Sequence, residues 1–164
     1  MKTITNIIQE KFELNKKTSK YRYFPNKFED LGNILDDKIN KFGYGTEDKP
    51  FILSDIDFSK VNTLSNAFDY IDFEYLDISG CNIEHITNFS GCFQGCKKLK
   101  KVIGFDTWKF DKNESYDLSF MFYRCTNLCD IEGLYKFKYN SEHHDITNML
   151  ESCPKLKKPD WYLK

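Results

Sequence analysis

A short motif occurs three times in this chain and restricts the folds that are open to it. It consists of an apolar residue, two further residues, Cys, two further residues and Leu, and it occupies residues 93–99, 122–128 and 150–156. Its cysteines, Cys96, Cys125 and Cys153, are 29 and 28 residues apart. A period of about 20 to 50 residues indicates a solenoid, in which each unit buries its apolar face against the next. Because stacked units form long binding surfaces, the repeat favours a binding protein over an enzyme.

The leucine that ends each motif also opens a short strand pattern. We expect five parallel strands of the L-x-x-L-x-L type, which begin at Leu53, Phe73, Leu99, Leu128 and Leu156. In this alignment Ile56 is the neighbour of Leu76 in the next strand. Between the strands, Thr or Ser followed by spaced apolar residues predicts capped helical turns, as at 61–68 and 86–93. Residues 108–116 and 135–144 are interpreted as insertions that form loops.

The clearest helix lies before the repeats, at residues 28–42. Its apolar residues recur every three or four positions and form one stripe, which consists of Leu31, Ile34, Leu35, Ile39 and Phe42. Gly43 is expected to end the helix, because glycine readily adopts the left-handed conformation that follows many helices. Solenoid ends need a cover. We therefore divide the chain into an N-terminal arm (1–27), a capping helix with its loop (28–50), and a repeat domain with a C-terminal cap (51–164).

Residues 86–99 read I-T-N-F-S-G-C-F-Q-G-C-K-K-L and resemble the core of BspA-type leucine-rich repeats, a class with about 25 residues per unit. The resemblance extends over residues 51–158. It implies an α/β fold, a right-handed leucine-rich-repeat-like solenoid of short parallel strands and short helices, and a non-enzymatic role in recognition. The segments 11–16 and 21–25 resemble the start of small proteins of gut bacteriophages and their hosts, which implies a phage-encoded or host-associated accessory protein.

Charge and hydropathy exclude several classes of partner. The chain has 24 basic and 25 acidic residues, whereas binding to nucleic acid calls for a basic excess that neutralises phosphates. No stretch approaches the roughly 18 consecutive apolar residues of a membrane span. Polar residues interrupt the first nine positions, so a signal peptide is not expected. We expect a cytoplasmic or virion-associated protein with a protein partner, no nucleic acid and no membrane insertion.

The six cysteines are expected to be buried thiols. Without a secretion signal a disulfide framework is disfavoured, and three of the six share one position in the repeat. The pairs Cys92/Cys96 and Cys125/Cys129 have a spacing that a zinc site tolerates, and three histidines lie near them in sequence, but four ligands would have to converge. No pattern fixes a nucleophile beside a base. We expect no metal, no cofactor and no catalytic residue.

Outward strand positions form two candidate columns for binding a partner. One column contains Asp57, Asp77, Ile103, Glu132 and Asp160; the other contains Asp55, Tyr75, Lys101, Asp130 and Lys158. Neighbouring strands are about 4.8 Å apart, so each column becomes a ladder of side chains. Like charges in such a ladder repel each other, and a cationic partner would relieve this cost. The alternative is a solvated polar face that prevents pairing between sheet edges.

The N-terminal arm supplies a second candidate surface. Tyr21, Tyr23 and Phe24 precede Pro25, and aromatic side chains are frequent anchors of protein interfaces. We expect the arm to pack weakly on its own domain and to dock on a partner. The function favoured by the sequence is non-enzymatic protein–protein recognition. The alternative is a structural component of a virion or assembly that docks through this arm.

Overall fold

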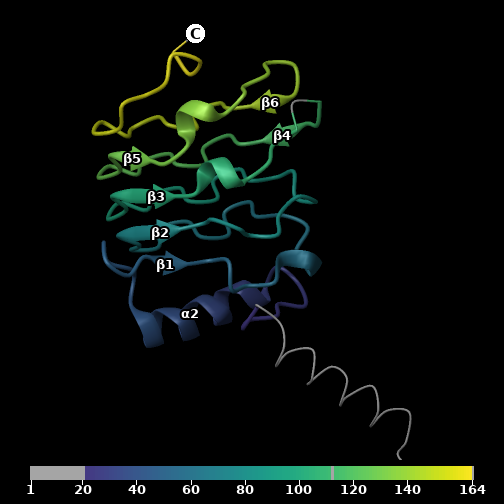
Figure 1. The fold of residues 1–164 in the computed structure, drawn as a ribbon, viewed down its shortest axis with the longest axis vertical. Coiled ribbons are helices and arrows are strands. Elements are labelled where there is room, and N and C mark those ends of the chain that lie inside the picture. Colours follow the sequence, from purple (N-terminus) through teal and green to yellow (C-terminus); the bar gives the residue numbers. More distant parts are fainter. Residues whose placement is uncertain (1–20, 112, 164) are drawn as a thin grey trace, which may run out of the picture.

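The computed structural model describes residues 21–111 and 113–163 and shows an α/β fold with two sheets of short parallel strands (Figure 1). The larger sheet has the order β1-β2-β3-β5, and these strands lie one above another along the long axis of the molecule. Their bounds are Phe51–Ile52, Tyr75–Asp77, Lys101–Ile103 and Asp130–Ile131. Each strand buries one apolar residue toward the core, such as Leu76, Val102 and Ile131, and turns its neighbours outward.

Helix α2 (Asp30–Phe42) lies at one end of this stack, next to β1 (Figure 1). Leu31 and Leu35 are buried, and Gly43 ends the helix at φ 71° with its N–H donating to the Ile39 carbonyl. The helix and its stop are therefore predicted correctly from the sequence. Phe42 differs from the prediction, because its side chain is 59% exposed although it continues the apolar stripe.

A second, two-stranded sheet begins at the ends of the two predicted insertions. β4 (Tyr116–Asp117) and β6 (His144–Asp145) pair in parallel on the other side of the molecule (Figure 1). His144 is only 3% exposed, and its ring packs against those of Tyr116 and Phe137. Most described residues of 108–116 and 135–144 form turns or irregular structure, as predicted, but a short 3-10 helix covers Leu134–Lys136 and a strand begins at the last residue of each segment. These strands were missed because two residues are too few to produce a visible alternation.

The segments expected to form capped helical turns are not helical. Alternate backbone N–H groups in each segment donate to carbonyls of the following unit: Leu64, Asn66, Phe68 and Tyr70 to Asn88, Ser90, Cys92 and Gln94; Phe89, Gly91, Phe93 and Gly95 to Asp117, Ser119, Met121 and Tyr123; and Leu118, Phe120, Phe122 and Arg124 to Asp145, Thr147, Met149 and Glu151. Two residues per unit have positive φ, as at Asn66 and Tyr70. Each segment thus combines turn bonds of its own, as from the Ala67 N–H to the Leu64 carbonyl, with bonds to the following unit, and it does not continue into a helix.

The repeated cysteine joins each unit to the one before it. The thiols of Cys96, Cys125 and Cys153 are buried, and each donates to a phenylalanine carbonyl of the preceding unit, at 3.2 Å to Phe68, 3.1 Å to Phe93 and 3.0 Å to Phe122. The rings of Phe68, Phe93 and Phe122 are stacked with centroids 5.4 Å apart. Burial of the cysteine column, predicted from the sequence, is confirmed. In the first unit, which lies next to α2, Ile71 takes this position. Burial of all six thiols is wrong, because Cys129 is exposed and Cys81 is half-buried.

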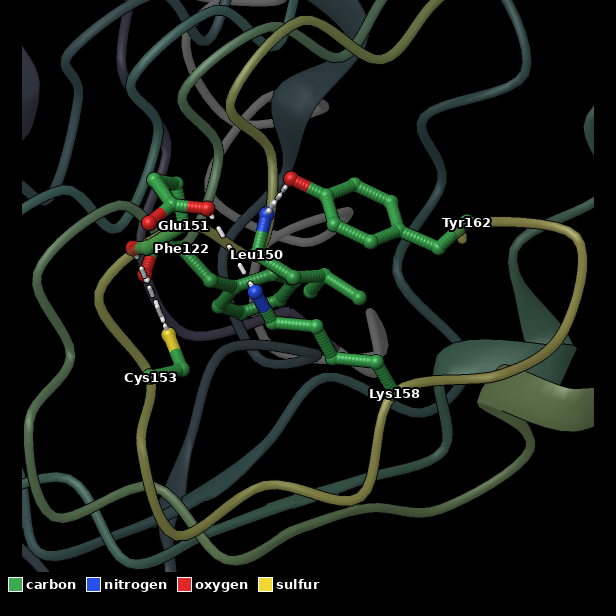
Figure 2. Close-up of polar contacts among 6 residues, drawn as sticks. All are labelled: Phe122, Leu150, Glu151, Cys153, Lys158 and Tyr162. Carbon is green, nitrogen blue, oxygen red and sulfur yellow. Dashed lines mark hydrogen bonds and ion pairs between the residues drawn. The ribbon is translucent and has the colours of Figure 1, made fainter. Parts of the chain in front are cut away.

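The C-terminal segment closes the last unit (Figure 2). Figure 2 shows the Tyr162 hydroxyl accepting a hydrogen bond from the Leu150 N–H at 3.1 Å, with Lys158 reaching Glu151 at 3.4 Å. Trp161 packs on Phe137. The fifth strand expected from Leu156 is absent, since the described residues after Cys153 form only turns and irregular structure.

The thiols lead to a first prediction. Burial raises the pKa of Cys92 well above its usual value and that of Cys153 to about 12, and only a thiolate attacks a thiol reagent. In the native protein at about pH 8 we expect the exposed Cys129 to be labelled well before Cys92 or Cys153. Mass spectrometry of the labelled peptides measures this order. Cys129→Ser is the control, and labelling of Cys153 as fast as Cys129 would contradict the prediction.

Candidate interaction surface

The outer face of the larger sheet brings together six members of the two predicted columns, whereas Lys158 and Asp160 are not on a strand of this sheet. Tyr75, Lys101 and Asp130 are direct neighbours on β2, β3 and β5, which forms one row across the sheet. The second row contains Asp77 beside Ile103, with Glu132 directly after β5. The register of these three strands therefore agrees with the predicted columns.

The charges on this face are largely paired within the protein. Lys101 Nζ lies 3.0 Å from Asp130 Oδ2, and this contact raises the pKa of Lys101. The Asp77 carboxylate accepts hydrogen bonds from the backbone N–H and the hydroxyl of Ser79. Glu132 lies at the end of its row and is exposed. The face thus presents a mixed surface of aromatic, aliphatic and charged groups instead of a ladder of like charges.

Asp55 and Asp57 do not belong to these rows, although the sequence predicted them there. Phe51, not Ile56, pairs with Leu76, and Ile52 therefore occupies the place beside Asp77. The apolar residues of 51–58 fit the strand pattern in two registers, and the chain already turns after β1, where the Ile56 N–H donates to Leu53. Burial alone would raise the pKa of Asp57, but hydrogen bonds from Asn82 and Ser59, with the charge of Lys60, lower it overall.

The described part of the N-terminal arm is packed on the domain. Tyr23 forms a parallel bridge with Ile56: its N–H donates to the Asp55 carbonyl, and its carbonyl accepts from the Asp57 N–H. Tyr21 and Phe24 flank this bridge and are both half-buried. Weak packing of the arm is therefore wrong for residues 21–24, because backbone hydrogen bonds hold them to the turn after β1. Residues 1–20 lie outside the described part.

A buried lysine at the N-terminal end was missed by sequence reasoning. Lys38 on α2 is 2% exposed, and its ammonium lies 2.5 Å from Asp55 Oδ1. The same ammonium lies over the rings of Tyr23 and Phe51, 4.7 and 5.3 Å from the centroids. Position 38 continues the three- and four-residue spacing of Leu31 and Leu35. This spacing places Lys38 on the buried face of the helix and could have revealed its burial from the sequence.

A cleft of about 540 Å³ opens between α2, the following loop and β1. Phe42, Phe51 and Ile52 provide apolar surface in it. Three cationic side chains, Arg22, Lys41 and Lys49, also line it. The cleft therefore combines apolar surface with positive charge, directly beside the edge of the larger sheet.

Comparison with known families adds one finding. Residues 38–161 match the family described as Mycoplasma protein of unknown function, DUF285. The chain belongs to this family. No curated protein and no solved structure matches the chain. The DUF285 segment begins at Lys38 and ends at Trp161, so it includes both sheets and the buried lysine but not the first turns of α2.

Two further kinds of feature matter for this DUF285 member: candidate metal sites and candidate membrane-spanning helices. Within residues 21–111 and 113–163, His, Cys, Asp and Glu side chains do not gather in a group that could hold a metal ion. His85, considered as a zinc ligand, directs Nε2 at the carbonyls of Phe58 and Val61 instead. In the same described segments, no helix is long and apolar enough to cross a membrane.

Proposed function

We propose that this chain is a non-enzymatic protein-recognition module, built as a right-handed leucine-rich-repeat-like solenoid of the BspA type. The observation that carries the proposal is the outer face of the larger sheet, where Tyr75 and Ile103 lie on β2 and β3 in defined register and Glu132 directly follows β5. Strands hold such side chains at fixed positions, so that little entropy is lost when a partner covers them. An enzyme would need convergent acid, base or nucleophilic groups, whereas on this face Lys101 is paired with Asp130 and the Asp77 carboxylate accepts hydrogen bonds from Ser79.

The alternative, a virion component that docks through its arm, has less support. Tyr23 already uses its backbone groups on its own domain, and its ring covers the Lys38 ammonium. Docking through this residue would break both sets of contacts. The cost would have to be recovered from the partner, so the open face of the sheet is the better candidate.

A triple variant tests the role of this face. We expect Tyr75→Ala, Ile103→Ala and Glu132→Ala together to weaken capture of a specific partner at least about tenfold, because aromatic and charged groups carry much of an interface's energy. Quantitative affinity capture from the source cells, with wild-type protein in parallel, measures the loss. The matched control removes three exposed side chains elsewhere, Glu84→Ala, Lys97→Ala and Tyr135→Ala. Equal capture by wild type and the triple variant would contradict the proposal.

A further inference from the structure

In the part of the chain that the structure describes, β1 has a strand neighbour, β2, on one side only, and α2 lies at its other side (Figure 1). β1 is the first strand in the sheet order, and the Leu53 N–H donates to Asp77 on β2. Alternate residues of a parallel strand direct their N–H and C=O groups to opposite sides. Phe51 and Leu53 therefore face β2, whereas the backbone groups of Ile52 face away from it. Among the described residues, no backbone group outside the sheet bonds to Ile52.

Apolar side chains are exposed at this edge. Ile52 is 46% exposed and Phe42 is 59% exposed, and both line the cleft beside β1. Phe51, at the same place, is buried. Large apolar side chains that are exposed together mark candidate binding sites. An extended chain alongside β1 would cover Ile52 and place alternate side chains against Phe42.

The charge of the cleft selects the kind of chain that fits. Lys38 is paired with Asp55, and Lys41 is paired with Asp37 outside the lining, which leaves Arg22 and Lys49 against Asp48. This excess of positive charge favours an acidic segment. Residues 1–20 of the chain contain five lysines and two glutamates, so their charge does not match the cleft.

We propose that this cleft binds an extended acidic segment of a partner protein, which adds to β1 as a further strand. The proposal deepens the recognition function above and rests on it. The segment's backbone pairs with the N–H and C=O of Ile52, as in other cases of strand addition. Its apolar side chains contact Phe42 and Ile52, and its carboxylates meet Lys41 and Lys49.

Synthetic peptides test the proposal directly. The probe is a fluorescein-labelled hexapeptide of alternating Glu and Val, and binding to the full chain is followed by fluorescence anisotropy. We expect saturable binding that weakens as the NaCl concentration rises, because exposed charges are screened by salt. Two matched peptides serve as comparisons: one has Lys in place of Glu, and the other carries backbone N-methyl groups that remove the donors needed for strand pairing. We expect at least tenfold weaker binding of both.

Variants of the protein locate the site. Lys41→Glu with Lys49→Glu should weaken binding of the Glu-Val peptide at least tenfold, whereas Lys97→Glu with Lys157→Glu, at exposed positions that do not line the cleft, should leave it unchanged. Circular dichroism and the melting temperature confirm that each variant is folded. The proposal would be overturned if the acidic and basic peptides bound equally, or if the variant with Lys41→Glu and Lys49→Glu bound the Glu-Val peptide as tightly as the wild type.

The two proposals fail in different ways. If the Glu-Val peptide does not bind but the triple variant of the outer face still loses its partner, the cleft inference is wrong and the recognition function stands. If the peptide binds at β1 while the triple variant captures the partner normally, the partner is recognised at the sheet edge instead of the outer face. A second copy of the chain in the cleft would appear as a dimer that the peptide cannot displace, and this outcome would overturn the acidic-segment proposal.

Discussion

Replacing Phe93 with alanine is expected to lower the free energy of unfolding by about 3–5 kcal/mol. The Phe93 ring is fully buried and stacks between those of Phe68 and Phe122. Truncation would remove both stacking contacts and leave a cavity in the middle of the column, which the surrounding units can fill only in part. For a chain of this size the change corresponds to a fall in melting temperature of roughly 6–20 °C.

Urea denaturation followed by circular dichroism measures the change. The matched control is Phe42→Ala, which removes the same side chain from a position that is 59% exposed and should change the unfolding free energy by about 1 kcal/mol or less. If Phe93→Ala and Phe42→Ala have similar effects, the phenylalanine column does not carry the stability that its burial implies.

The cysteine column shows how far the sequence could predict this structure. The period and the apolar character of the column place Cys96, Cys125 and Cys153 in the core, and the structure confirms their burial. The sequence does not reveal why cysteine recurs. The thiol is small enough for the core and also donates a hydrogen bond to a carbonyl of the preceding unit. An aliphatic side chain has no donor and could not make this bond.

The parts that sequence reasoning missed share a physical cause. β4 and β6 contain two residues each, so no alternation of apolar and polar residues identifies them. The register of β1 was wrong because 51–58 offers apolar residues at two compatible spacings, and only the pairing of Phe51 with Leu76 decides between them. The turns with positive φ at Tyr70 and Arg124 lie at non-glycine residues, where the sequence carries no conformational signal.

Of the two candidate surfaces, the sheet face could be predicted from the sequence and the cleft could not. Tyr75, Lys101 and Asp130 were aligned correctly because β2, β3 and β5 each follow a phenylalanine or leucine that fixes their phase. The cleft at β1 could not be predicted, since it depends on how α2 packs against the sheet edge. Helix–sheet packing brings Lys38 and Asp55, 17 residues apart in sequence, into contact.

The ion pair between Lys38 and Asp55 should be the electrostatic contact on which stability depends most. Asp55→Ala would leave the Lys38 ammonium buried at 2% exposure without its carboxylate. Breaking a buried pair by removing one partner costs about 3–5 kcal/mol, because an uncompensated charge stays in a poorly solvated site. The backbone of Asp55, which accepts from Arg22 and Tyr23, is retained in the variant, so the loss reports on the carboxylate.

The double variant separates this effect from a simple loss of packing. Lys38→Met keeps most of the side-chain volume and removes the charge, so Lys38→Met with Asp55→Ala should regain most of the stability that Asp55→Ala alone loses. The coupling energy follows from the four unfolding free energies of the cycle. The matched control is the exposed pair on the same helix, Lys41 and Asp37, at 2.8 Å; Asp37→Ala should cost at most about 1 kcal/mol. A double variant as unstable as Asp55→Ala would show that the carboxylate acts through packing, and that the buried charge of Lys38 does not need it.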